Sequence, residues 1–499
     1  MSYIRLLKND YIDSKDSKKI SIIIEIIAFV SIGFFILFGQ FGHQFGFPLD
    51  DAWIHQTYAR NLAENGRWSY TGESVSGGST SPLWTMILSL GHLLKIGIPW
   101  TFILSAFIYI LVVYFSTQII IEIKPIQKKW TLLLAAFVII FDWHLLWAAA
   151  SGMETIIFIL GVVILIYLLL QESPVWLFVG ILNGVLVWIR PDGLTLLGPS
   201  MFILLLGFLQ QKWSWKQFVK FVVPFLFLFT LFMVFNFSIS GELFPTTFYA
   251  KQAEYQSLLK SPLSSRILNE FIQIVTGSGI LLLPGFIYVL FQGIKKFDWK
   301  MLSIILWILG YIIIYSLRLP VTYQHGRYMM PVIVPFLLVG ITGIFSIFEK
   351  INKEKIRKLI ATGWMGTIVI ITFVFYFLGL QIYRSDVIII NKLLVDPAKW
   401  IQLNLSESEI IATHDIGAIG YFTKNPIVDL AGLINPEIIP IINDETELVT
   451  YMKSKNVAYY FGFADWYKYS DRWGPIIKEY SEKYQGKIEK IVIIQLKDY

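Results

Sequence analysis

The chain has 499 residues, a formal net charge of +6 and a mean hydropathy of +0.62. Hydrophobic residues make up 56% of it and charged residues only 15%, against about a quarter in a soluble domain. This excludes a soluble globule and indicates that a bilayer surrounds most of the chain. The absence of cysteine excludes disulfides and thiolate metal sites. The modest basic balance fits the cytoplasmic loops of a membrane protein and not nucleic-acid binding.

About eleven apolar stretches have the length, or nearly the length, that a membrane span needs. Backbone polar groups must be paired inside lipid, so each stretch is predicted to be a helix. They are residues 20–40, 99–122, 131–149, 153–170, 174–189, 193–210, 218–238, 267–292, 301–318, 328–348 and 359–382. The shorter stretch Pro82–Leu94 is either interfacial or half-buried, and an odd count of eleven requires that it does not cross.

Basic residues cluster in alternate connections and predict the orientation. The clusters are Arg5/Lys8/Lys15/Lys18/Lys19, Lys124/Lys128/Lys129, Lys212/Lys216/Lys220, Lys295/Lys296/Lys300 and Lys350/Lys353/Lys355/Arg357/Lys358. By the positive-inside rule these face the cytoplasm. The other connections then face out, at residues 41–81, 151–154, 190–192, 240–266 and 318–327. We therefore expect a multi-pass protein of the cytoplasmic membrane with its active site and C-terminal region on the extracytoplasmic side.

The composition changes at Tyr383, where charged residues become frequent. Residues 1–382 are predicted to form a helical membrane domain, and residues 383–499 a small extracytoplasmic α/β domain. In the latter, residues 410–417, 425–430, 457–463 and 488–496 are predicted as strands. Residues 396–405, 444–455 and 473–484 are predicted as amphipathic helices. The fold class is thus a polytopic α-helical membrane protein with a C-terminal α/β domain.

The paired acids Asp50 and Asp51 in the first outer loop are the strongest functional signal. A carboxylate can accept the proton of a hydroxyl group as a general base. An aspartate at this position can also cap the helix predicted to follow it. Both interpretations hold if one aspartate caps and the other acts. His55 is expected at the surface, and the turn SGGSTSP at residues 76–82 is interpreted as a flexible hinge.

Three other outer connections carry ionisable residues. Glu154 lies between two predicted helices and is interpreted as functional, whereas Asp142 and His144 are interpreted as ordinary span-end residues. Arg190 either pairs with Asp192 or points into an external cavity. Lys251, among Phe244, Phe248 and Tyr249, either binds a phosphate or sugar face or lies on an interfacial helix.

Arg327 begins a predicted span on the outer side, against the positive-inside trend. Its guanidinium is suited to a phosphate. The alternative is an interfacial anchor together with Tyr328. The outer side therefore combines carboxylates, cations and aromatic rings, a combination that fits an anionic lipid-linked substrate.

The motifs DDAWIHQTYARNL, SGMET, IRPDGL, FPTTFYAK and HGRYMMPVIVP, in this order, resemble the GT-C superfamily of membrane glycosyltransferases. Within it, the similarity is greatest to the terminal arabinofuranosyltransferases of mycobacterial cell walls and their bacterial relatives. The resemblance covers most of residues 20–350. The Ile- and Lys-rich composition is unlike that of a high-GC actinobacterium, so arabinose is not carried over.

The resemblance implies a polyprenyl-phosphate sugar as donor and a general base at Asp50. Asp51 would orient the acceptor, the donor phosphate or a divalent metal, and no other cofactor is implied. The donor phosphate would be held by Arg327, Lys251, Arg190 and His325. The sugar or acceptor pocket would include Glu154, Asp192, Tyr249 and Trp53.

The predicted function is therefore an inverting glycosyltransferase. It would move a sugar from the donor lipid to a hydroxyl group of a cell-envelope glycan or lipid during cell wall biogenesis. The alternatives are a transporter or flippase of a lipid-linked sugar, and a non-catalytic glycan-binding protein. A transporter predicts charges in the middle of spans and repeated halves. Here the ionisable residues gather on one side and the sequence shows no repeat, which favours the enzyme.

Overall fold

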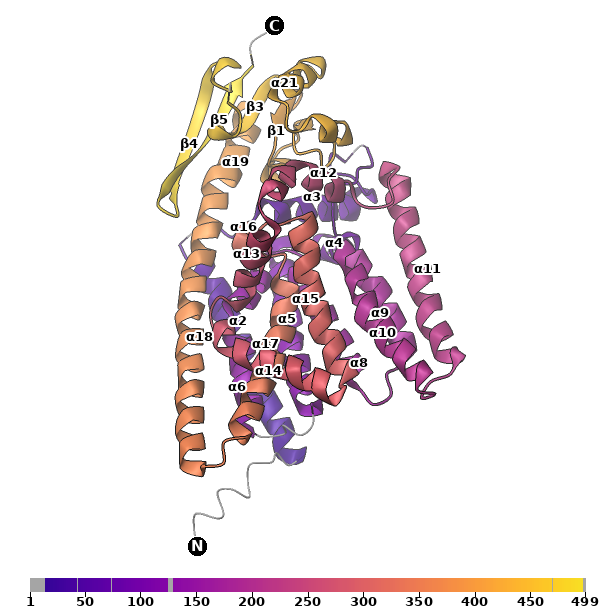
Figure 1. Cartoon of the computed structure of the whole chain (residues 1–499). Coiled ribbons are helices and arrows are strands. Elements are labelled where there is room, and N and C mark those ends of the chain that lie inside the picture. Colours follow the sequence, from indigo (N-terminus) through magenta and orange to yellow (C-terminus); the bar gives the residue numbers. More distant parts are fainter. Residues whose placement is uncertain (1–13, 43, 73, 124–128, 469, 497–499) are drawn as a thin grey trace.

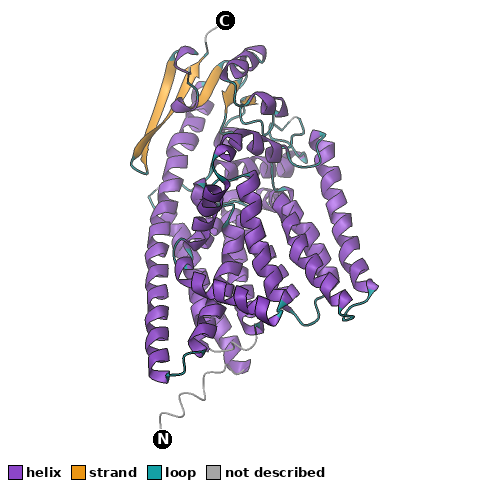
Figure 2. Ribbon diagram, in the orientation of Figure 1, coloured by secondary structure: helices purple, strands orange, loops and turns teal. Residues whose placement is uncertain are grey.

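The computed structural model describes residues 14–42, 44–72, 74–123, 129–468 and 470–496. It is a bundle of long helices with a small sheet at one end (Figures 1 and 2). The first described helix, α2 (Ser14–Gln40), begins at the end of the bundle opposite the sheet. The predicted basic clusters near the N-terminus and at 124–129 fall, apart from Lys19, on residues whose side chains lie outside the described part.

Eight helices among the described residues are long and apolar enough to cross a membrane, so the chain is a multi-pass membrane protein. Besides α2, their bounds are Gly97–Glu122 (α5), Pro191–Leu209 (η1 with α10), Trp215–Ser240 (α11), Gly279–Lys296 (α14), Trp299–Arg318 (α15), Met330–Glu349 (α17) and Glu354–Asn404 (α18 to α19). The helices α6 (Lys129–Phe141) and α7 (Trp143–Ala150) form a further span bent by 46°. Two shorter apolar helices are α8 (Thr155–Leu170) and α9 (Trp176–Ile189).

The predicted span at 267–292 is interrupted, and this prediction was wrong in its bounds. The structure has two helices there, α13 (Leu263–Val275) and α14 (Gly279–Lys296), separated at Gly277 with a φ of 93°. Only α14 has the composition of a span, because α13 is amphipathic. Pro82–Leu94 forms α4 (Pro82–Leu93), whose 12 residues are too few to cross a bilayer. α4 packs against α3 (Asp50–Asn65).

Short helices close the end of the bundle beneath the sheet. They are α3, α12 (Thr246–Glu254), the 3₁₀ turn η2 (Tyr255–Lys260), α13 and the single turn α16 (Tyr323–Gly326). Figure 1 shows α3 and α12 beneath the sheet, with α16 and α13 below them, level with the upper part of α15. Four of them come from the connections that the sequence predicts to be extracytoplasmic, and most of α13 comes from the start of the predicted span at 267–292. The ionisable residues of those connections therefore gather at one end of the molecule.

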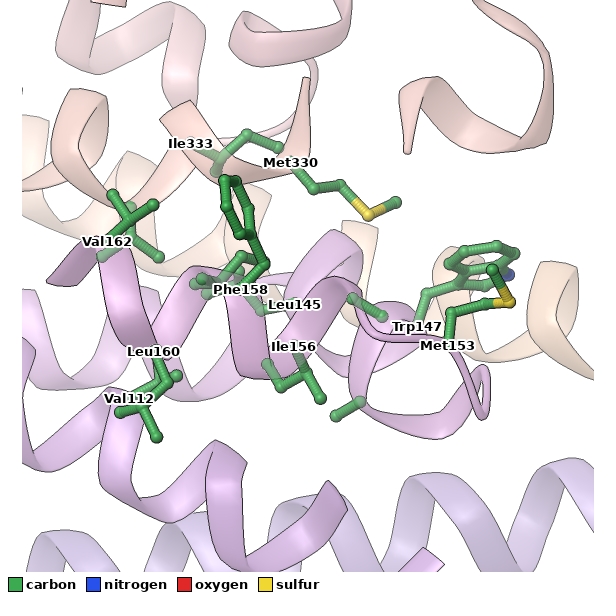
Figure 3. Close-up of a cluster of buried hydrophobic side chains, with 14 of the residues drawn as sticks. Val112, Leu145, Trp147, Met153, Ile156, Phe158, Leu160, Val162, Met330 and Ile333 are labelled. Carbon is green, nitrogen blue, oxygen red and sulfur yellow. The ribbon is translucent and has the colours of Figure 1, made fainter. Parts of the chain in front are cut away.

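The centre of the bundle is apolar and tightly packed. Figure 3 shows Phe158 of α8 beside Met330 and Ile333 of α17, and Leu160 of α8 beside Val112 of α5. These side chains belong to one continuous buried cluster. The cluster fixes α17, and therefore the residues immediately before Met330, relative to α8.

The C-terminal region is a five-stranded sheet with helices. Its strands are β1 (Ile411–Thr413), β2 (Ile427–Asp429), β3 (Tyr459–Phe463), β4 (Ile476–Tyr484) and β5 (Lys487–Gln495), in the order β2-β1-β3-β5-β4. β1 pairs in parallel with β2 and β3, and β5 pairs in antiparallel with β3 and β4. The helices are α19 (Asp396–Asn404), α20 (Gly417–Phe422) and α21 (Glu445–Ser454), with the 3₁₀ turns η4 (Pro436–Ile441), η5 (Ala464–Trp466) and η6 (Ser470–Arg472). α18 (Glu354–Ile390) leads into α19 through the π turn η3 (Asn391–Val395).

The helix predicted at 473–484 is wrong, because most of it is strand β4. β4 is an edge strand whose residues are exposed on most positions, so no buried face imposes an apolar alternation on its sequence. Pairing with β5 across the turn at Gln485 and Gly486, both at positive φ, determines its conformation instead.

We expect Phe158→Ala to lower the free energy of unfolding by about 3–5 kcal/mol, because it leaves a cavity in the core that holds α17. Thermal unfolding in detergent would measure the effect. Phe227→Ala is the matched control, since Phe227 is 63% exposed on a span. Equal losses for the two variants would contradict this account of the core.

Candidate active site

A carboxylate and two cations meet where α3, α12 and the segment before α17 come together. The Arg327 Nη2 atom donates to Asp51 Oδ2 at 2.6 Å, and Lys251 Nζ lies 3.4 Å from the same oxygen. Both cations also donate to the Tyr328 hydroxyl, at 3.2 and 3.3 Å. We call Asp51, Lys251, Arg327 and Tyr328 the cation cluster.

Only part of the hydrogen-bonding capacity of the Arg327 guanidinium is used. Its side chain is 4% exposed, yet Nε and Nη1 are buried without a hydrogen-bond partner among the described residues. Buried guanidinium groups without partners are costly, so these two donors are suited to an anionic ligand. The cluster is open on the carboxylate side, where the Asp51 side chain is 28% exposed.

A left-handed turn places Arg327 in the cluster. Gln324, His325 and Gly326 have φ values of 55°, 59° and 64°. Such conformations are unfavourable for residues with a Cβ and persist only where packing holds them. At Gly326 any Cβ would lie 2.7 Å from Gln273, so the close approach of α13 requires glycine.

Electrostatics in the cluster favour the ionised carboxylate. α3 lies outside the membrane-spanning segments. Burial alone would raise the pKa of Asp51, but Lys251 and Arg327 outweigh it and hold this pKa far below its usual range. An anion that pairs with Lys251 and Arg327 would weaken their interaction with Asp51 and so raise the pKa of Asp51.

Asp50 lies in a different environment from its neighbour. Its two oxygens accept hydrogen bonds from the backbone N–H groups of Gly417, at 2.6 Å, and Ala418, at 2.8 Å, at the start of α20. A Cβ at residue 417 would lie 2.0 Å from the Asp50 carbonyl oxygen, so only glycine allows this approach. Burial, together with Asp415, raises the pKa of Asp50 to about 8, although the two N–H bonds act in the opposite direction.

Three more of the predicted residues lie beside the cation cluster. Arg190 Nε donates to Asp192 Oδ1 at 3.0 Å, and Arg190 Nη1 lies 3.8 Å from Glu154 Oε1. The predicted pairing of Arg190 with Asp192 is thus confirmed, whereas the alternative of an external cavity stays a prediction. Arg190 Cζ lies 5.5 Å from the centre of the Tyr328 ring, Arg327 Cζ lies 5.1 Å from it, and Lys251 Nζ lies 5.9 Å from it.

The remaining predicted site residues lie elsewhere. His325 Nε2 is 2.7 Å from Asp386 Oδ2 of α18. Trp53 is fully buried between α3 and α20, with its ring 5.0 Å from those of Tyr421 and Phe422. Tyr249 lies on α12 and packs on Phe248, with ring centres 5.4 Å apart.

The structure also places three features that the sequence suggested to be structural or at the surface, namely His55, the turn at 76–82 and Asp142. His55 was expected at the surface, and this was wrong: it is 2% exposed, 3.0 Å from Thr85 and 3.4 Å from Glu154. The turn at 76–82 packs closely, because the Tyr58 hydroxyl bonds Ser76 and accepts from the Gly78 N–H. Asp142, predicted as an ordinary span-end residue, lies instead at the break within the bent span, where it caps α7 by accepting from the Leu145 N–H.

From the sequence, Tyr328 was interpreted only as part of an interfacial anchor, and Asp386 was not recognised as a functional residue. Tyr328 follows Arg327 directly, and an aromatic ring next to an outer-side arginine was the available signal. Asp386 is the carboxylate within the apolar helix α18, and a buried acid there is costly enough to indicate function.

The surroundings of Asp51 do not fit a divalent metal. Its nearest charged neighbours are Arg327 and Lys251, which would repel a metal ion. In the part of the chain that the structure describes, no group of three His, Asp or Glu side chains is arranged to hold one.

The arrangement of helices resembles solved membrane proteins. ArnT from Cupriavidus metallidurans bound to undecaprenyl phosphate aligns with a TM-score of 0.57 at 11% identity, covering 96% of this chain and 98% of that one. Its apo structure gives a TM-score of 0.58 at 11% identity, covering 94% and 97%. The oligosaccharyltransferase AglB from Archaeoglobus fulgidus, in complex with an inhibitory peptide and a dolichol-phosphate, gives 0.52 at 11% identity, covering 90% and 70%.

These neighbours are GT-C membrane glycosyltransferases, so the GT-C fold expected from the sequence motifs is confirmed. A family model described as "Domain of unknown function (DUF8728)" matches residues 388–491, which include the whole sheet except the last part of β5. No curated protein sequence matches the chain.

The raised pKa of Asp50 predicts a pH dependence of stability. The folded protein keeps the Asp50 proton up to a pH of about 8, whereas the unfolded chain releases it near 3.8. Raising the pH through this window therefore favours unfolding. We expect the thermal midpoint to fall over this range more steeply for the wild type than for Asp50→Asn. Parallel pH profiles would show that Asp50 does not titrate in this window.

Proposed function

We propose that the protein is an inverting glycosyltransferase that uses a polyprenyl-phosphate sugar. It acts on the face of the cytoplasmic membrane opposite the lysine-rich connections. The observation that carries the proposal is the cation cluster, in which a partly exposed carboxylate lies beside two cations, one of which, Arg327, has two buried donors without a partner among the described residues. The GT-C fold supports it, as does the undecaprenyl phosphate bound in the ArnT structure.

In this proposal Arg327 and Lys251 hold the donor phosphate. The Arg327 guanidinium offers Nε and Nη1 to the phosphate oxygens, and Lys251 adds a charge from α12. As the bond between the sugar carbon and the phosphate oxygen breaks, negative charge grows on the leaving phosphate. Fixed cations in a poorly hydrated site stabilise that charge without reorganising.

The role of general base, predicted for Asp50, passes in this proposal to Asp51. Both oxygens of Asp50 already accept N–H bonds, and its side chain is nearly inaccessible. Asp51 is accessible and touches the cations. When the donor phosphate takes Arg327 and Lys251, the pKa of Asp51 rises and it becomes a better base.

The reaction is then a single displacement. The acceptor oxygen forms a bond to the anomeric carbon while its proton moves to an Asp51 oxygen and the polyprenyl phosphate leaves. Attack from the side opposite the leaving group inverts the anomeric centre. Arg190 lies 5.5 Å from the centre of the Tyr328 ring, and we assign contact with the sugar to it and to its neighbours Glu154 and Asp192.

Asp51→Asn tests the base directly. We expect sugar transfer to fall by about 100-fold or more, because a positioned base contributes about 10²–10⁴-fold. Membranes carrying each variant would be given a panel of radiolabelled polyprenyl-phosphate sugars and crude cell-envelope acceptors. Asp50→Asn is the matched control, with the same chemical change one residue away, and its loss should be much smaller. A larger loss for Asp50→Asn than for Asp51→Asn would return the role of base to Asp50.

Arg327→Lys tests the phosphate site. It keeps the charge but removes the forked donors, which are worth about 1.5–3 kcal/mol each when bonded to a charged group. We expect the KM for the donor to rise by about tenfold or more at a similar KM for the acceptor. Arg318→Lys is the control, because Arg318 is an exposed arginine at the end of α15. An unchanged donor KM in Arg327→Lys would place the phosphate elsewhere.

A further inference from the structure

A separate cavity lies between α7, α18, the segment 322–325 and the turn joining β4 to β5. Its volume is about 630 Å³, and we call it the α18 cavity. Figure 1 shows α18 along one edge of the molecule with the β4–β5 hairpin beside its upper end. The residues that matter here are Trp143, Trp147, His325, Leu378, Ile382 and Asp386.

In the part of the α18 cavity next to the β4–β5 turn, one buried carboxylate accepts hydrogen bonds from three surrounding side chains. Asp386 Oδ2 accepts hydrogen bonds from Trp147 Nε1 at 2.8 Å and from His325 Nε2 at 2.7 Å. Asp386 Oδ1 accepts from the Tyr484 hydroxyl at 2.6 Å. Asp386 thus joins α7, α18, the strained turn before Arg327 and the β4–β5 hairpin.

The polar lining suits a neutral, hydroxyl-rich group and not a phosphate. Besides Asp386 and Tyr484 it includes the amides of Gln273, Gln324 and Gln485, and no lysine or arginine is among the described residues that line it. With no lysine or arginine beside it, a carboxylate repels a phosphate, and the one imidazole at Asp386, that of His325, already bonds its Oδ2 atom. Hydroxyl groups, in contrast, pair well with carboxylates and amides. Trp143 and Trp147 add aromatic surface of the kind that packs on a sugar ring.

A second part of the cavity is apolar. Phe375, Leu378 and Ile382 of α18 line it, and Leu378 is 46% exposed. These three residues belong to a helix that is long and apolar enough to cross a membrane. A polar part next to an apolar part on a membrane helix matches an amphipathic lipid.

The α18 cavity ends next to the cation cluster. Leu49 and His325 line the cavity, and two residues further along each segment Asp51 and Arg327 form their ion pair at 2.6 Å. A hydroxyl group presented from this cavity would therefore lie near the proposed base.

We propose that the α18 cavity binds the acceptor, and that the acceptor is a membrane glycolipid with an uncharged sugar head group. The identification of this lipid as the acceptor rests on the proposed function. The binding of this lipid in the α18 cavity does not rest on the proposed function, because a lipid can bind there without any sugar transfer.

Ile382→Trp would test the site by filling the α18 cavity. Ile370→Trp is the matched control, since Ile370 lies on the same helix, is 65% exposed and does not line the cavity. Native mass spectrometry of the purified proteins would measure binding of a monoglycosyl diacylglycerol and, separately, of undecaprenyl phosphate. We expect glycolipid binding to weaken by about tenfold or more only in Ile382→Trp, corresponding to about 1.4 kcal/mol. Undecaprenyl phosphate should bind all three proteins equally, which also shows that Ile382→Trp is folded.

Equal glycolipid binding by all three proteins, or none by the wild type, would overturn the proposal. Selective loss of undecaprenyl phosphate in Ile382→Trp would overturn it as well and assign the cavity to the donor chain. Arg327→Lys separates the two proposals, because it should weaken undecaprenyl phosphate binding and leave the glycolipid bound. Undecaprenyl phosphate binding that is unchanged in Arg327→Lys, together with glycolipid binding that is weakened in Ile382→Trp, would contradict the proposed donor site and support the glycolipid site in the cavity.

Discussion

The ion pair between Asp51 and Arg327, shared by Lys251, connects three parts of the chain that are distant in sequence. It couples the first loop, α12 and the start of α17. A buried guanidinium needs an anion, and removing the partner of such a charge is strongly destabilising. Because Arg327 needs an anionic partner, the cation cluster can also bind a phosphate, which would replace the Asp51 carboxylate as the partner of both cations. The geometry of the proposed donor site is thus formed before any ligand binds.

The neighbouring aspartate connects this site to the C-terminal domain. Successive residues of a helix point in different directions, so Asp50 reaches α20 while Asp51 reaches the cations. Further bonds hold the same surfaces together: Arg60 donates to the carbonyls of Tyr421 and Gly420, and Asn443 donates to that of Ala253 on α12. The C-terminal domain therefore packs directly on the helices that carry Asp51 and Lys251. Any movement of α20 would be transmitted to α3 through Asp50.

Much of this arrangement follows from the sequence, for identifiable reasons. Span helices are long and continuously apolar, so composition alone locates them, and the strands β1, β2, β3 and β5 are short apolar runs. β4 was missed because an exposed edge strand carries no such signal. Ionisable residues at the outer ends of spans indicated the site. The sequence could not tell which of two adjacent aspartates faces the cations, since that depends on how α20 packs. The burial of His55 and the bonding of Asp386 likewise depend on contacts with residues far away in the chain.

An experimental structure of the protein with undecaprenyl phosphate bound would show whether Arg327 and Lys251 hold the donor phosphate. We expect the phosphate oxygens to lie within hydrogen-bond distance of Arg327 Nε or Nη1 and of Lys251 Nζ, with Asp51 released from both cations. A phosphate bound in the α18 cavity beside Asp386, with the pair between Asp51 and Arg327 intact, would contradict this expectation.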